Sequence, residues 1–132
     1  MTQQEIMALT LYGEVGNDGL PVQEALASLI MNRVKYAHTH HQIWWGTTPE
    51  QVCLCPFQFA CWQRQEDWLS AAQKTPLYQS CLRISARAIG GVLRDNTHGA
   101  TLYHDKDEDA AWALSLVPVA QVGRLLFYKE LH

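Results

Sequence analysis

The sequence predicts a mostly helical α+β domain with a small antiparallel β-sheet near its C-terminus. Apolar residues recur at helical spacing through most of the N-terminal two thirds of the chain,. Helix-start signals, a threonine followed by proline or by a glutamate three positions on, precede three of these stretches,. Segments typical of strands are confined to residues 101–104 and 124–129,. The length of 132 residues suits one domain, so we expect residues 1–132 to fold as a single unit,.

The composition excludes several classes of protein. Hydrophobic residues make up 48% of the chain and charged residues 17%, which excludes an intrinsically disordered chain,. A net charge of -3 without a long basic run argues against a nucleic-acid partner,. We see no stretch apolar enough for a membrane span and no secretory signal, so we expect synthesis in the cytoplasm,. The five Trp, five Tyr and three Phe suit a core, or a groove that stacks on sugars or bases,.

The first helix is expected over residues 3–15. Thr2 and Glu5 form a capping-box pattern at its start, and Ile6 and Leu9 continue at helical spacing,. The glycine- and asparagine-rich residues 16–19 end it, because these residue types tolerate the backbone of a helix terminus,.

The second helix is expected over residues 21–36 and is apolar on most sides. Such a helix lies at the centre of a domain. Asn32 falls on its apolar stripe, so we expect this amide to point inward and to fix the loop after the first helix,. Arg33 is interpreted as a second scaffold residue.

The middle of the chain predicts shorter elements. Residues 48–51 read as a second capping box that starts a short helix, and residues 55–62 read as a packed loop,. A third helix is expected over 65–74. Thr75, followed by proline, starts a longer helix whose apolar face runs to Val92,.

The last third of the chain holds the strands. Residues 101–104 are expected to pair with 124–129 in a hairpin-like sheet. Alternation along the first strand places Tyr103 opposite Leu102, which makes Tyr103 the candidate to face a groove and His104 a lesser one.

No metal or cofactor is expected. The acidic residues 105–109 lack the glycine and the ligand spacing of a calcium loop,. The four cysteines are interpreted as reduced, buried thiols, with a zinc site as the alternative that their spacing disfavours. They are Cys53, Cys55, Cys61 and Cys81.

Glu14 is the sharpest candidate for chemistry. It falls at the end of the first helix, among apolar and aromatic neighbours. The negative end of the helix dipole and the apolar surroundings both favour a protonated carboxyl group, as a general acid needs. A solvated surface glutamate is the alternative.

Several segments carry a resemblance, in the same order along the chain. They are residues 11–15, 22–34 and 58–62, then Gly99, Ala100, Tyr103, His104, Trp112, Gly123, Phe127 and Tyr128. Together they resemble the SleB-type cell wall hydrolases, the spore-cortex-lytic enzymes and their relatives. The resemblance covers nearly the whole chain.

The resemblance implies a lysozyme-like fold that cleaves peptidoglycan glycan strands between N-acetylmuramic acid and N-acetylglucosamine, often as a lytic transglycosylase. Glu14 takes the place of the family's catalytic glutamate, and Asp18 that of its second acidic residue. The Arg-Gly between them in the family is replaced by Gly16 and Asn17 here. A single glutamate can perform both proton transfers of a transglycosylase, whereas a hydrolase with Asp18 as second carboxylate stays open.

Substrate-binding candidates follow from the same motifs. Gln58 and Phe59 lie in an irregular loop, where Gln58 is expected to bond an N-acetyl sugar or Glu14, with local backbone as the alternative. Tyr103 and His104 join them from the strand. Four other rings are interpreted as core more than as subsites: Trp62, Trp112, Phe127 and Tyr128,.

Rival interpretations belong to other classes. One is a non-catalytic peptidoglycan-binding module or phage structural part that keeps the fold. Another is an interaction domain that uses Trp44 and Trp45, although a solvated loop with two packed rings is favoured. An enzyme that acts at the wall without a visible signal fits a phage or prophage origin and a holin-type helper for export.

Overall fold

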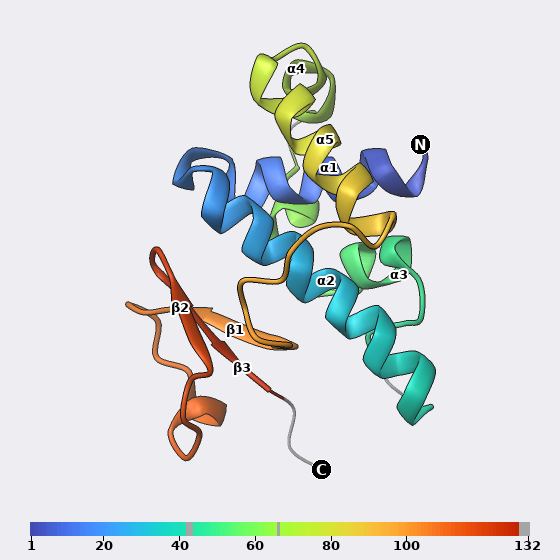
Figure 1. The fold of residues 1–132 in the computed structure, drawn as a ribbon. Coiled ribbons are helices and arrows are strands. Elements are labelled where there is room, and N and C mark those ends of the chain that lie inside the picture. The colour runs from blue at the N-terminus through green and yellow to red at the C-terminus, as the bar shows by residue number, and fades with distance from the viewer. Residues whose placement is uncertain (42–43, 66, 130–132) are drawn as a thin grey trace.

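The structure, a computed structural model, describes residues 1–41, 44–65 and 67–129. Helices form the first two thirds of the chain, and a small sheet follows them (Figure 1). The helices are α1 (Gln3–Val15), α2 (Leu20–His40), α3 (Pro49–Leu54), α4 (Leu69–Gln73) and α5 (Pro76–Ile89). The strands are β1 (Leu102–Asp105), β2 (Ala120–Val122) and β3 (Leu125–Tyr128). Short 3₁₀ turns are η1 (Gly16–Asp18), η2 (Ala60–Gln63) and η3 (Ala111–Ala113).

Helix α2 lies at the centre, as its apolar surface predicted. It packs against α1, α3 and α5 and also touches β2 (Figure 1). Its bounds exceed the predicted 21–36 at the C-terminal end, where the helix continues as far as His40. Leu26, Leu29 and Ile30 are fully buried in its middle. The helix therefore joins the helical body to the sheet.

Helix α1 has the predicted bounds, because its start and end are set locally. The Thr2 hydroxyl accepts a hydrogen bond from the Glu5 N–H, and the Glu5 carboxylate accepts one from the Thr2 N–H. Gly13, in its last turn, allows η2 to come close: a Cβ atom at this position would lie 2.5 Å from Cβ of Cys61. This close approach brings η2 against the end of the helix that carries Glu14.

Three predictions about the middle of the chain need correction. The hydroxyl of Thr48 caps α3, but the Gln51 side chain accepts from the N–H of Thr47 instead of closing a box on Thr48. Helix α4 is shorter than the predicted 65–74. Trp68 is the residue that precedes its first turn, because the Trp68 ring stacks on Tyr12 of α1. Val92 lies beyond the end of α5 and is exposed, since α5 ends at Gly90.

The three strands form one antiparallel sheet in the order β1-β3-β2. The predicted pairing is confirmed, with Tyr103 opposite Phe127 and Asp105 opposite Leu125. Strand β2 was not predicted. It is three residues long and follows an exposed segment, so its own sequence carries little signal,.

Asn32 points inward as predicted, but it holds a different loop. Its amide nitrogen donates to a carboxylate oxygen of Asp95 at 2.9 Å and to the carbonyl oxygen of Ala100 at 3.0 Å. These partners lie between α5 and β1, whereas the expected partner was the loop after α1. Asn32 fixes the connection into the sheet because it sits on the side of α2 that faces that connection.

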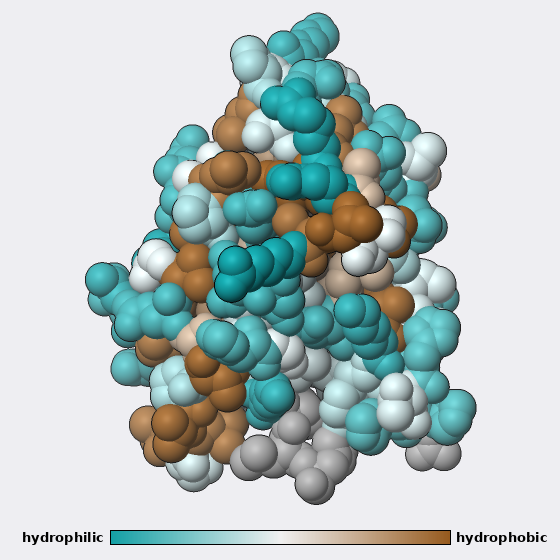
Figure 2. Space-filling model, in the orientation of Figure 1, coloured by the Kyte–Doolittle hydropathy of each residue, from teal (hydrophilic) through white to brown (hydrophobic). Residues whose placement is uncertain are grey.

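An apolar region of the surface lies over the η3 segment. Figure 2 shows hydrophobic side chains gathered over the η3 segment, at the lower left of the view, where Leu114 and Val117 are more than four-fifths exposed. Trp112, interpreted as core, is 46% exposed, so that prediction is wrong. Within the described ranges, no cluster of three or more metal-ligating side chains occurs, and no helix is long and apolar enough to cross a membrane.

The cysteines are unpaired in the structure. Cys53, Cys61 and Cys81 are buried as predicted, whereas Cys55 is half-buried. Burial raises the pKa of the Cys53 thiol to about 12 and that of Cys81 to about 11, so both thiols stay protonated near neutral pH,.

Candidate active site

Glu14 lies in the last turn of α1 and is half-buried. One carboxylate oxygen accepts the backbone N–H of Cys61 at 2.9 Å. Burial, and then the negative charge of Glu14, raise the pKa of the Cys61 thiol, so this neighbour remains neutral,. The contact fixes one oxygen of Glu14 on η2, which the close approach at Gly13 makes reachable.

The charge of Glu14 affects the pKa of Tyr103 on β1. Burial raises the pKa of the Tyr103 hydroxyl most, and the negative charge of Glu14 raises it further. The ring is stacked between Phe59, at 6.3 Å between centroids, and Phe127, at 6.2 Å. The charge of Glu14 thus acts on a strand residue far from it in the sequence, and the Tyr103 hydroxyl stays protonated at neutral pH.

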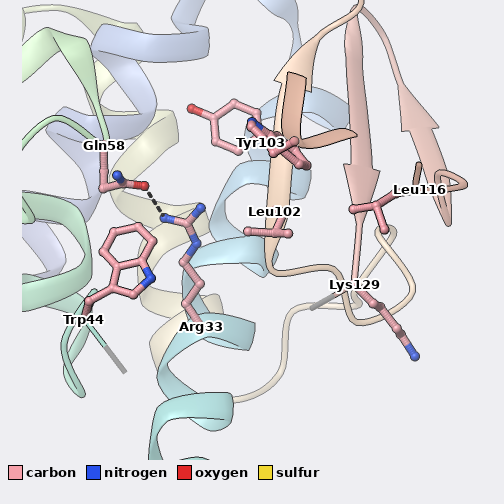
Figure 3. A pocket seen from close by; sticks show the side chains of 8 residues that line it. Arg33, Trp44, Gln58, Leu102, Tyr103, Leu116 and Lys129 are labelled. Atoms are coloured by element: carbon pink, nitrogen blue, oxygen red, sulfur yellow. Dashed lines mark hydrogen bonds between the residues drawn. The ribbon is translucent and has the colours of Figure 1, made fainter. Parts of the chain in front are cut away.

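A pocket of about 520 Å³ opens beside Tyr103. In Figure 3, Trp44 and Gln58 lie on one side of it, and Leu102 and Tyr103 of β1 lie on the other. Among the residues that the structure describes, the lining is Arg33, Trp44, Gln58, Leu102, Tyr103, Trp112, Leu116 and Lys129. Its walls combine exposed aromatic faces with polar side chains, which is the surface that stacks on and orients a sugar ring.

Arg33 of α2 holds the two sides of the pocket together. Its Nε donates to the carbonyl oxygen of Thr101 at 2.7 Å, next to β1, and its Nη1 donates to Oε1 of Gln58 at 3.3 Å (Figure 3). The guanidinium also lies over the rings of Trp45 and Phe59. Arg33 is 4% exposed, so it acts as the buried scaffold residue that the sequence predicted.

The other substrate-binding candidates occupy different places. Phe59 is 2% exposed and lies beneath Tyr103, so it supports that ring from the core. His104 lies outside this pocket: its Nδ1 is 2.7 Å from the Asp105 carbonyl oxygen, and its Nε2 is 2.8 Å from the hydroxyl of Tyr128. It lines a neighbouring pocket of about 360 Å³ beside η3.

Asp18 is held by an arginine that the sequence did not single out. Nε and Nη2 of Arg124 donate to the two carboxylate oxygens of Asp18 at 2.9 and 3.0 Å. Arg124 also donates to Asp105 and to the backbone oxygen of Glu14. A single arginine in a tight turn carries no local signal of this role, because two of its partners, Asp18 and Glu14, are more than 100 positions away along the chain.

The sequence-based prediction also missed other residues of the site. Trp44 is 63% exposed and lines the pocket, while Trp45 is buried and donates from its ring nitrogen to the Arg33 carbonyl oxygen. Lys129 joins the lining from the end of β3. The prediction of two packed rings is therefore right for Trp45 alone.

A helical body with a small terminal sheet and a ring-lined pocket is the architecture of an enzyme class that the family match identifies as peptidoglycan-degrading. The chain belongs to the Cell Wall Hydrolase family, whose model matches residues 17–128. Glu14 precedes the matched span. The resemblance to the SleB-type hydrolases is confirmed at the level of family and fold.

Two solved structures share the fold. The catalytic domain of the germination-specific lytic transglycosylase SleB from Bacillus anthracis is 22% identical, with a TM-score of 0.69; the match covers 96% of this chain and 93% of that one. The catalytic domain of the Bacillus cereus SleB protein is 21% identical, with a TM-score of 0.68 and coverage of 96% and 89%. A search of curated proteins found no match.

Proposed function

We propose that this chain cleaves the glycan strands of peptidoglycan between N-acetylmuramic acid and N-acetylglucosamine, as a lytic transglycosylase with Glu14 as general acid and base. The observation that carries the proposal is the place of Glu14 in the last turn of α1: it is half-buried and held through one oxygen by the Cys61 N–H, and its charge acts on Tyr103, which lines the pocket although Glu14 is not among the described lining residues. Family membership and the likeness to a lytic transglycosylase support it.

One carboxyl group suffices for this reaction. Protonated Glu14 donates its proton to the glycosidic oxygen as the bond from that oxygen to C1 of muramic acid breaks. The Glu14 carboxylate then takes the proton of the C6 hydroxyl of the same sugar, whose oxygen bonds to C1 and closes a 1,6-anhydro ring. The proton is back on Glu14 at the end, and no water is consumed.

The pairing of Asp18 favours this mechanism over a two-acid hydrolase. Arg124 binds both carboxylate oxygens of Asp18, whereas the Cys61 N–H binds one carboxylate oxygen of Glu14. A nucleophile or general base needs an oxygen free to approach the sugar or a water molecule. We therefore assign Asp18 a structural role.

Gln58 and Tyr103 are the proposed substrate contacts. Arg33 binds the amide oxygen of Gln58, which turns the amide nitrogen toward other acceptors, such as the carbonyl of an N-acetyl group,. The protonated Tyr103 hydroxyl supplies a further donor near Glu14. Phe59 contributes by packing under Tyr103, and His104 contacts only a substrate that extends past η3.

Digestion of purified cell wall sacculi tests the proposal. Wild-type protein is expected to release soluble muropeptides with 1,6-anhydro ends, and Glu14→Gln is expected to lose about 10²- to 10⁴-fold in rate. Glu50→Gln makes the same chemical change at an exposed position and should keep wild-type activity. Reducing ends in the mass spectrum would overturn the transglycosylase mechanism.

The same assay separates the rival class. A wall-binding or phage structural domain predicts that wild type and Glu14→Gln both sediment with sacculi and neither releases fragments. Equal, measurable release by the two would instead remove Glu14 from the mechanism. Asp18→Asn distinguishes the two acids, because a catalytic Asp18 would make this variant as inactive as Glu14→Gln.

A further inference from the structure

Arg124 occupies the turn between β2 and β3 and binds three separate segments. Its guanidinium donates to the backbone oxygen of Glu14 at 3.1 Å, to both oxygens of Asp18, and to the carboxylate of Asp105. These acceptors belong to the end of α1, to η1 and to the end of β1. One side chain therefore ties the helix that carries Glu14 to the strand that carries Tyr103.

The contact with Glu14 suits the end of a helix. The last carbonyl groups of a helix have no partner within it, and a cation at this end is favoured by the helix dipole. Arg124 satisfies one of these oxygens, and it does so on the residue proposed as the acid. The anchored atom is on the backbone, so Arg124 places Glu14 without occupying its carboxylate.

The contact with Asp105 reaches the other side of the site. Asp105 is two positions beyond Tyr103 on β1. Its pKa is held below the ordinary value by the N–H of Asp107 first and by Arg124 next, so it stays charged and paired near neutral pH. The guanidinium thus sits between Glu14 on one side and the strand of Tyr103 on the other.

From these contacts we infer that Arg124 is a positioning residue, which sets the distance between Glu14 and the Tyr103 side of the pocket. The inference rests on the proposed function. Misplacement of a catalytic group by about 1 Å can cost about 10²-fold in rate. The planar fork of an arginine satisfies two acceptors at fixed angles, whereas a lysine supplies only a point charge.

The solvent exposure of the Arg124–Asp18 ion pair distinguishes a positioning role of Arg124 from a role in stability alone. The Arg124 and Asp18 side chains are 38% and 25% exposed. Ion pairs that water reaches contribute little to stability. The molecule offers a control, since Arg87 and Glu24 form a pair at 3.4 Å with exposures of 49% and 25%, and this pair joins α5 to α2.

The test compares Arg124→Lys, Arg124→Ala and Arg87→Ala in the full chain, with soluble glycan fragments as substrate. We expect Arg124→Lys to lower kcat at least tenfold with KM within threefold and Tm within a few degrees of wild type. Arg124→Ala should lower kcat further, and Arg87→Ala should match wild type. Hydrogen exchange of the backbone amides at residues 14–18 should speed up in the Arg124 variants only.

Each other outcome has a defined meaning. Wild-type kcat in Arg124→Lys, or a rise in KM alone, overturns the positioning role. An equal fall of kcat in Arg87→Ala does so too, because it would show a general effect of losing a surface pair. If Glu14→Gln is inactive while Arg124→Lys is normal, only this inference fails; if Glu14→Gln is active, the proposed function fails and the inference with it.

Discussion

The forces that hold the helical body together differ from those that attach the sheet region to it. In α1, α2 and α5, many apolar side chains are fully buried, and Leu9, Leu29 and Ile84 are 0 to 1% exposed. The sheet region from residue 94 onward buries fewer apolar side chains and leaves several exposed around η3 (Figure 2). It is fixed to the helices by hydrogen bonds from single polar side chains as well as by the buried Leu125 and Phe127.

Three of these side chains span the boundary. Asn32 and Arg33 reach from α2 to the connection before β1, and Arg124 reaches from the sheet to the end of α1. Apolar packing is strong and non-directional, whereas hydrogen bonds specify angles and distances. The comparison teaches that the body supplies stability, and the polar links supply the geometry of the site.

The largest expected effect on stability lies in the body. Leu29→Ala removes a fully buried side chain of α2 and is expected to cost about 2 to 5 kcal/mol of unfolding free energy,. The same change at Leu114, which is 89% exposed in the sheet region, should cost less than about 0.5 kcal/mol,. Urea unfolding measures both, and equal losses would contradict the difference between the regions.

An intermediate effect is expected at the polar links, with a dependence on pH. Burial raises the pKa of Asp95, but hydrogen bonds from Thr97, Asn32 and Gly99 outweigh it and hold the pKa below its usual range. A carboxyl group of this kind stabilises the fold above its unfolded pKa, near 4, and loses this effect as the pH falls through its folded value.

Asp95→Asn should therefore cost about 1 to 3 kcal/mol at pH 7, where the charged carboxylate accepts these bonds,. The gap in Tm between this variant and wild type should shrink as the pH falls below about 4. Thermal melts from pH 7 down to pH 3 measure it. A gap that stays constant over this range would mean that the charge of Asp95 contributes nothing.

The smallest effect on stability is expected at the pocket. Trp44→Ala removes a ring that is 63% exposed, so the unfolding free energy should change by less than about 0.5 kcal/mol,. The KM for glycan fragments should rise several-fold, since a lost stacking face weakens sugar binding. Phe57→Ala, at an exposed ring outside the pocket, should leave both quantities unchanged, and a matching rise in KM there would remove Trp44 from the binding surface.

The sequence predicted what local chemistry decides. The bounds of α1 follow from Thr2 and Glu5 at its start, and the central place of α2 follows from its all-round apolar surface. Helix α4 was overestimated because stacking of Trp68 on Tyr12 outweighed helical spacing,. The hydrogen bonds between the sheet region and the helices could not be predicted from the sequence, since Arg124 and its partner Asp18 are separated by 106 positions.

The anchorage of Glu14 by Arg124 also has a consequence in time. A ribosome makes α1 before it makes the turn that carries Arg124, and domains assemble as their segments emerge. The backbone oxygen of Glu14 and the carboxylate of Asp18 gain their partner only after residue 124 has been added. The anchor of the proposed acid therefore forms more than 100 residues of synthesis after the helix that bears it.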